Sequence, residues 1–251
     1  MVKRILLILA IFIILVAKFV YANELAIVVK NVQKAADQGD ASAQVNLGSM
    51  YIDGKGVLKD DKQAMKWYRK AADQGEAYAQ YNLGGMYEYG KGVLQDDKQA
   101  VKWYRKAADQ GNVRAQQTLG IGYYYGILTA KDYKKAFIYA KKSADQGDAQ
   151  GQFLLGIIYE NGKSVDIDNV KALALMRLAA KQGDREAITY LKAKVSGDSE
   201  LEYKLGIIYL DAIDVIKDVE LGKKWLKKSA QQGFSLAKIR LKQEKSKQSS
   251  F

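Results

Sequence analysis

The residue types that most often carry enzyme chemistry are scarce in this 251-residue chain. It contains no histidine and no cysteine, which removes Ser-His-Asp triads, Cys-His nucleophilic pairs and nearly all zinc and haem sites. Carboxylates remain, and the acidic pairs Asp60-Asp61 and Asp96-Asp97 are candidates for acid–base catalysis. Because both pairs stand at the same point of a repeated sequence, we favour helix capping as their role.

One short motif matches part of a phosphate-binding loop. The segment Asn161-Gly162-Lys163-Ser164 ends in Gly-Lys-Ser, but its spacing from Gly156 is one residue too long and it follows a predicted helix rather than a strand. We interpret it as a loop between two helices. The sequence therefore predicts no catalytic residue, no cofactor, no metal site and no enzyme activity.

The elements that position these residues belong to a repeat of 36 residues. Ala71–Lys106 reads AADQGEAYAQYNLGGMYEYGKGVLQDDKQAVKWYRK, and Ala35–Lys70 reads AADQGDASAQVNLGSMYIDGKGVLKDDKQAMKWYRK. A fixed period of this size indicates a repeat architecture. The predicted organisation is a signal peptide over 1–22, a capping helix over 23–34, four repeats over 35–178, a truncated repeat over 179–192, a fifth full repeat over 193–228, and a closing helix with a charged tail over 229–251.

Each repeat has the pattern of a helix hairpin. In the second repeat, apolar residues recur at spacings of three and four in two stretches, Ala79–Tyr87 and Ala100–Ala107. Gly90 and Gly92 lie between them, where a turn needs conformational freedom, and Gly84 should mark a close approach of two helices. The chain has no proline. These features predict an all-α stack of helix hairpins.

The residues of the repeat resemble those of a known family. The pattern QG-x-A-x-AQ-x-x-LG-x-x-Y-x-x-G-x-GV, followed by an acidic pair and A-x-x-WY-x-KA, is similar to the Sel1-like repeat, a relative of the tetratricopeptide repeat. The resemblance covers roughly Ala35 to Gly233 and is weak in the truncated repeat. It implies a right-handed α-solenoid and a role in protein binding or scaffolding.

The N-terminus has the pattern of a secretory signal peptide. A basic start precedes the apolar run Ile5–Ala17, and Val20 and Ala22 fit cleavage before Asn23. The alternative is an uncleaved membrane anchor, but the run is short for a membrane span and Lys18 interrupts it. We therefore expect no stable membrane span after cleavage, and a periplasmic or secreted protein.

The chain is strongly basic, with 40 Lys and Arg against 28 Asp and Glu, a formal net charge of +12. Many of the lysines, such as Lys66 and Lys102, fall on the predicted second helices, and we interpret them as a solvated outer face. A basic surface attracts nucleic acids, anionic glycans or acidic proteins. The predicted export disfavours nucleic acid as a partner.

The resembled tetratricopeptide geometry implies that the first helix of each hairpin lines a concave groove. Tyrosine and arginine are common at binding hot spots, although aromatic residues here could equally thicken the packing between helices. Counted from the Leu-Gly pair of each repeat, the predicted partner-binding residues are Tyr78, Tyr81, Glu88, Tyr89, Arg114, Gln117, Tyr124, Tyr125, Phe153 and Tyr203.

The predicted function is a non-catalytic interaction scaffold or adaptor of the bacterial cell envelope, which binds a protein or peptide partner in its groove. One alternative is a factor that binds peptidoglycan or another anionic glycan through stacked aromatic rings. Another, which needs a carboxylate pair, is a cell-wall hydrolase. The sequence leaves the identity of the partner and the oligomeric state open.

Overall fold

The computed structural model describes residues 24–194, 198–211 and 219–248, and within these ranges the regular secondary structure is helical. The predicted signal peptide and Asn23 lie outside the described residues, as do parts of the predicted fifth repeat. Residues 24–37 form a first helix. The helices that follow are α2 (Ala41–Asp53), α3 (Asp61–Asp73), α4 (Ala77–Tyr89), α5 (Asp97–Asp109), α6 (Val113–Tyr125), α7 (Tyr133–Asp145), α8 (Ala149–Asn161), α9 (Asn169–Lys181), α10 (Arg185–Lys194), α11 (Ser199–Asp211), α12 (Val219–Gln231) and α13 (Ser235–Gln248).

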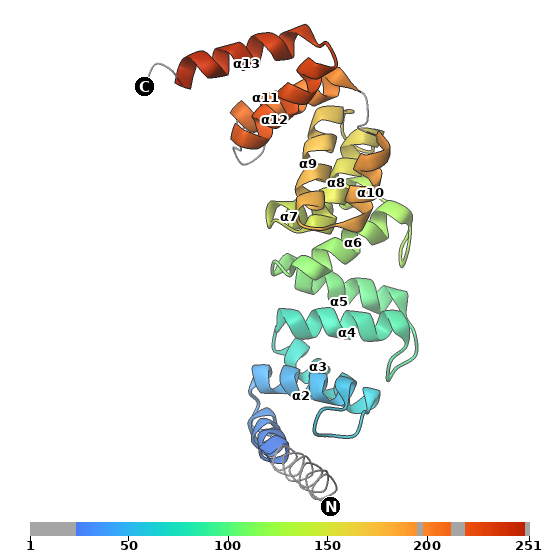
Figure 1. Cartoon of the computed structure of the whole chain (residues 1–251). Coiled ribbons are helices and arrows are strands. Elements are labelled where there is room, and N and C mark those ends of the chain that lie inside the picture. The colour runs from blue at the N-terminus through green and yellow to red at the C-terminus, as the bar shows by residue number, and fades with distance from the viewer. Residues whose placement is uncertain (1–23, 195–197, 212–218, 249–251) are drawn as a thin grey trace, which may run out of the picture. The chain divides into compact units, whose positions relative to one another are not determined.

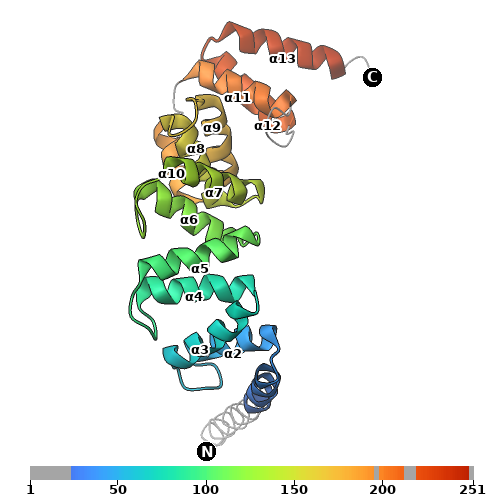
Figure 2. The ribbon, with the colours of Figure 1, turned by 180° about the vertical axis from the view of Figure 1, so that it is seen from behind.

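Consecutive helices pack in pairs as hairpins. The pairs α2/α3, α4/α5, α8/α9 and α11/α12 are in contact, and Figures 1 and 2 show α4 and α5 side by side from both directions. We call α2, α4, α6, α8 and α11 the first helices, and α3, α5, α7, α9 and α12 the second helices. The predicted fold class, an all-α solenoid of stacked helix hairpins, is confirmed.

The chain divides into two compact units, the first ending at Ala115 and the second beginning at Gln116. The first unit contains residues 24–37 and the helices α2 to α5. The second unit contains α7 to α13, and the division falls within α6.

The first aspartate of each acidic pair caps a second helix. The carboxylate of Asp60 accepts hydrogen bonds from the backbone N–H groups of Lys62 and Gln63, at 2.9 and 3.0 Å. Asp96 accepts one from Gln99 at 3.0 Å. An N-cap carboxylate satisfies backbone donors that have no partner within the helix, so the capping interpretation is confirmed for Asp60 and Asp96, while Asp61 and Asp97 are the first residues of α3 and α5.

The glycine of each Leu-Gly pair lies where the two helices of a hairpin touch. At Gly84, a Cβ atom would stand 2.7 Å from both Cδ1 and Cε1 of Tyr104 on α5. At Gly48 the corresponding contact is with Tyr68, at 2.9 Å. Both tyrosine rings are buried. The predicted close approach at Gly84 is therefore confirmed, because no side chain fits between the glycine and the ring without displacement.

In the first four hairpins, a pair of glutamines joins the start of the first helix to the end of the second helix. Buried polar groups need hydrogen-bond partners, and here one amide side chain donates to the other. The Nε2-to-Oε1 distances are 2.8 Å for Gln74 to Gln44, Gln110 to Gln80 and Gln146 to Gln116, and 2.9 Å for Gln182 to Gln152. In the last hairpin Glu202 takes the place of the acceptor glutamine, and the Nε2 of Gln232 lies 2.5 Å from its Oε2.

The loop between the two helices of a hairpin needs a left-handed residue at one fixed position. Gly92 has a φ of 69° there, and a Cβ would lie 2.4 Å from the carbonyl oxygen of Asp61. Ser164 stands at the same repeat position with a φ of 70°, which is uncommon for a residue other than glycine. The Gly-Lys-Ser segment is therefore an interhelical loop, as predicted.

Candidate functional site: tyrosine clusters on the first helices

Four of the predicted partner-binding residues, Tyr78, Tyr81, Glu88 and Tyr89, lie on α4. The side chains of Tyr78 and Tyr89 are 45% and 67% exposed. Tyr81 is half-buried, and its ring centroid lies 5.5 Å from that of Tyr104 on α5. We call Tyr78, Tyr81, Glu88 and Tyr89, together with Tyr104 of α5, the α4 cluster.

Glu88 is the polar centre of the α4 cluster. The hydroxyl of Tyr104 donates to its Oε2 at 2.5 Å. Burial of the ring, followed by the hydrogen bond and charge of Glu88, raises the pKa of Tyr104. The hydrogen bond to Glu88 is also the main cause of the raised pKa of Tyr89. Both phenols therefore stay protonated and act as donors, and Glu88 is held as an acceptor between two rings.

The cluster continues toward the preceding hairpin. The hydroxyls of Tyr68 and Ser49 lie 2.9 Å apart. The pKa of Tyr68 is raised mainly by burial, with smaller contributions from Tyr78 and Asp53. Asp53 at the end of α2 and Tyr78 at the start of α4 therefore both lie near the Tyr68 hydroxyl. Aromatic rings and carboxylates share this side of the first unit.

The second unit has an aromatic cluster of its own around Tyr124. The ring of Tyr124 contacts Tyr125 and Tyr133 edge-on, with centroids 4.9 and 5.6 Å away. The Nδ2 of Asn161 on α8 donates to its hydroxyl at 3.3 Å. Burial raises the pKa of Tyr124, and the hydrogen bond from Asn161 acts in the opposite direction. Tyr125 remains 53% exposed.

The remaining predicted residues do not join these clusters. Phe153 is half-buried against Tyr190 of α10, with centroids 6.2 Å apart, and Tyr203 packs against Phe234 at 5.2 Å. Arg114 is exposed and Gln117 is partly buried. A role of these four residues in partner binding stays a prediction.

Sequence reasoning missed two tyrosines that contact the carboxylates of the first helices. Tyr104 lies in the predicted buried stretch Ala100–Ala107, yet its hydroxyl reaches Glu88. Tyr190 of α10 donates in the same way to Glu160 of α8. The available signal was the position of the two glutamates, which both stand five residues after the leucine of a Leu-Gly pair.

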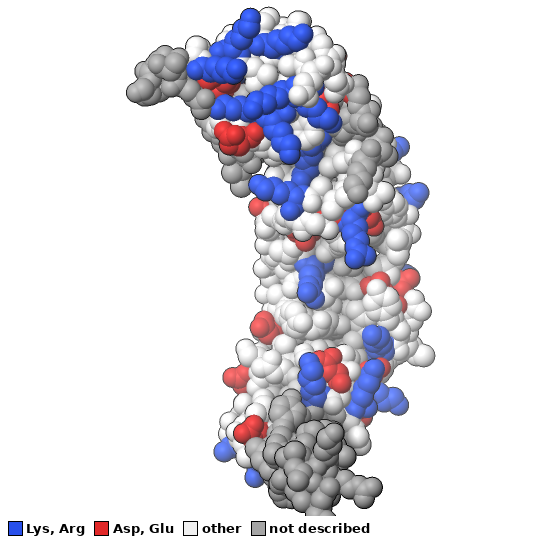
Figure 3. Space-filling model, in the orientation of Figure 1, with Lys and Arg blue, Asp and Glu red and all other residues white. Residues whose placement is uncertain are grey.

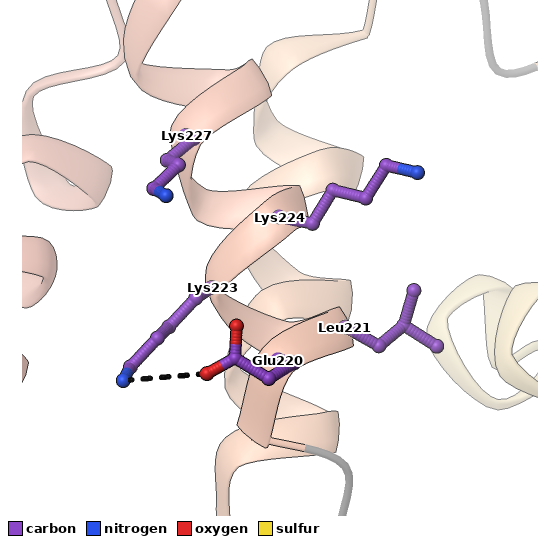
Figure 4. A pocket seen from close by; sticks show the side chains of 5 residues that line it. All are labelled: Glu220, Leu221, Lys223, Lys224 and Lys227. Atoms are coloured by element: carbon purple, nitrogen blue, oxygen red, sulfur yellow. Dashed lines mark ion pairs between the residues drawn. The ribbon is translucent and has the colours of Figure 1, made fainter.

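The basic residues gather elsewhere, on the second helices and near the C-terminus. Figure 3 shows Lys and Arg crowded on the part of the second unit that carries α11 to α13. An open cavity of about 390 Å³ on α12 is lined by Glu220, Leu221, Lys223, Lys224 and Lys227 (Figure 4). The ammonium of Lys223 lies 3.8 Å from the carboxylate of Glu220. This surface is cationic, with few acidic side chains to offset it.

The described part of the chain has neither a cluster of metal ligands nor a membrane-spanning helix. Across residues 24–194, 198–211 and 219–248, no three acidic side chains are grouped so that they could hold a metal ion. Within the same ranges, no helix has both the length and the apolar character needed to cross a membrane.

Stacked helix hairpins that present aromatic clusters define a repeat scaffold. A model of the Sel1 repeat matches residues 41–76, 77–112, 113–148, 149–184 and 199–234. The chain therefore belongs to the Sel1 repeat family, whose members are generally protein-interaction scaffolds. No match was found among curated proteins.

The chain is similar to several solved structures. A Sel1 repeat protein from Oxalobacter formigenes is 32% identical over 90% of this chain and 84% of its own, with a TM-score of 0.61. A protective antigen of uropathogenic Escherichia coli with an SLR fold is 31% identical over 84% of this chain and half of its own, with a TM-score of 0.41. An immunity protein from Pseudomonas aeruginosa, Pa5087, is 24% identical over 87% of this chain and 82% of its own, with a TM-score of 0.43.

Proposed function

We propose that the protein is a non-catalytic adaptor of the bacterial cell envelope, periplasmic or secreted, that holds a protein or peptide partner on the α4 cluster. Large, partly exposed tyrosines suit this role because each buries much apolar area and keeps a polar hydroxyl. The family supports a scaffolding role in general. The location and the binding face are the parts that we add.

The proposal rests mainly on a comparison of α4 with α2. The first two repeats are almost identical in sequence, yet Tyr78, Tyr81 and Tyr89 replace Ser42, Val45 and Asp53 at equivalent positions. Both hairpins keep the same aspartate cap, the same glycine-to-tyrosine contact and the same glutamine pair. The fold therefore does not need tyrosine at these three positions, which favours a role in binding.

The same comparison supplies the test. The variant Tyr78→Ser with Tyr81→Val places the residues of α2 on α4, and the first hairpin already tolerates them. We expect partner capture by the protein from envelope extracts to fall at least about tenfold, since two hot-spot tyrosines can contribute about 2 kcal/mol or more. Crosslinking with mass spectrometry measures the capture, and circular dichroism checks the fold.

The control is Lys102→Ala, which changes an exposed side chain of α5 and should leave capture unchanged. Full-strength capture by the folded double-tyrosine variant would exclude the α4 cluster as the binding face. Retention on isolated peptidoglycan, without a stoichiometric protein partner, would favour the glycan-binding alternative.

The envelope location has a separate test. The protein recovered from its native cells should begin at Asn23, because the basic start, the apolar run and the Val20-x-Ala22 site favour cleavage there. N-terminal sequencing after cell fractionation gives the answer. An intact Met1 in the membrane fraction would show that the segment is retained as an anchor.

A further inference from the structure

The charges of the chain are unevenly divided between the two kinds of helix. The second helices α3, α5 and α7 each carry four Lys or Arg residues. In contrast, α2, α4 and α8 carry none. Among the other first helices, α6 has only Arg114 and α11 only Lys204. A protein with a formal net charge of +12 thus presents first helices that are nearly free of cationic side chains.

Carboxylates on these helices are held in place by tyrosine hydroxyls. Tyr104 donates to Glu88 in the first unit, and Tyr190 donates to Glu160 in the second. A carboxylate has about four acceptor sites, so the hydrogen bonds from Tyr104 and Tyr89 leave about half of the capacity of Glu88 unused. Within the described residues, no ion pair involves Glu88. It is a fixed negative charge with room for a cation.

The surroundings of Glu88 suit a cation as well. Tyr89 is exposed beside it and hydrogen-bonded to it, and the faces of aromatic rings attract ammonium and guanidinium groups. One cation of the chain already uses this surface, because the Nζ of Lys91 lies 5.9 Å from the ring centroid of Tyr89. Asp53 and Tyr78 both act on the neighbouring Tyr68 hydroxyl, and Lys55 pairs with Asp53 at 2.9 Å.

From these observations we infer that the α4 cluster recognises a cationic partner, a protein segment that presents arginine or lysine side chains to Glu88 and the tyrosines around it. This inference rests on the proposed function and names the class of its partner. Arginine fits better than lysine, because its planar guanidinium can bind a carboxylate with two hydrogen bonds and stack on a ring at the same time.

The net charge of the protein makes the test stringent. At low salt, a basic protein repels a cationic peptide overall, so binding requires a local acidic site. The probes are two fluorescein-labelled peptides, one of five Arg-Gly pairs and one of five Glu-Gly pairs, each titrated with the mature chain and followed by fluorescence anisotropy. We expect the Arg-Gly peptide to bind, and a Lys-Gly peptide of the same length to bind more weakly.

The decisive variant is Glu88→Gln, which keeps an acceptor for Tyr104 but removes the charge. It should weaken binding of the Arg-Gly peptide about tenfold, as expected for the loss of a hydrogen bond to a charged group. Tyr89→Ser should also weaken it. The matched control is Glu220→Gln on α12, whose side chain is 89% exposed, and it should leave the affinity unchanged.

Three results would overturn the inference: no binding of the Arg-Gly peptide, equal losses in Glu88→Gln and Glu220→Gln, or unchanged binding in Glu88→Gln. The proposed function has a separate test. It would be wrong if the folded variant Tyr78→Ser with Tyr81→Val still captured the native partner at full strength. If that variant loses its partner while the Arg-Gly peptide does not bind, the α4 cluster is the binding face but its partner is not cationic. Binding of only the Glu-Gly peptide would place recognition on the lysines instead and would also overturn the inference.

Discussion

The substitution Gly84→Val is expected to lower the free energy of unfolding by about 1–3 kcal/mol or more, the range for side chains forced into a well-packed contact. A Cβ at this position would lie 2.7 Å from two ring carbons of Tyr104. The ring cannot yield easily, because it is 2% exposed and its hydroxyl is held by Glu88. Urea denaturation followed by circular dichroism measures the change.

The neighbouring glycine supplies the control. At Gly85 the nearest atom to an added Cβ is the Tyr104 hydroxyl oxygen at 3.5 Å, an ordinary contact. Gly85→Ala should therefore raise stability by up to about 1 kcal/mol, because alanine favours a helix over glycine. Two adjacent glycines should thus respond with opposite sign. A similar loss at both positions would mean that the hairpin contact is not where Gly84 places it.

The second large effect is expected at Lys228. The side chain of Glu202 is fully buried, and the ammonium of Lys228 lies 2.7 Å from its Oε1. Lys228→Met would leave this carboxylate buried with no cation beside it. Breaking a fully buried ion pair costs about 3–5 kcal/mol. Because the Lys228 side chain is 47% exposed, water screens the pair, and we expect a smaller loss of about 2–3 kcal/mol.

A second substitution should rescue this variant. The first four repeats place a glutamine where Glu202 stands, and each pairs with a glutamine at the end of the second helix. Glu202→Gln combined with Lys228→Met should restore that arrangement with Gln232 and return stability to within about 1 kcal/mol of the parent. A double variant as unstable as Lys228→Met alone would show that the lysine acts by packing, for instance against Trp225, rather than by charge.

The fold was largely predictable because its determinants are local and repeated. The period, the helical spacing around Leu83 and Trp103, and the acidic caps each act within one hairpin, so a single sequence contains them. The role of the glutamines was not predicted, because the partners lie 30 residues apart and an Ala-Gln pair shows no preference for a particular contact.

The candidate site was only partly predictable for a similar reason. Register on α4 identified the positions of Tyr78 and Tyr89, which are exposed as expected. The register could not show that the ring of Tyr81 packs against that of Tyr104. Nor could it show that Phe153 packs against Tyr190, which lies on a helix of the truncated repeat. Those contacts depend on where a neighbouring helix lies, which the spacing along one helix does not determine.

The central claim is that the α4 cluster, rather than the lysine-bearing second helices, holds the partner. Site-specific photocrosslinking in the native cell tests it most directly, with the photoreactive residue placed at Tyr89 in one variant and at Lys102 in the other. Both side chains are exposed, so either position can report a contact. We predict a discrete covalent adduct from position 89 and none from position 102; an adduct from position 102 alone would contradict the claim.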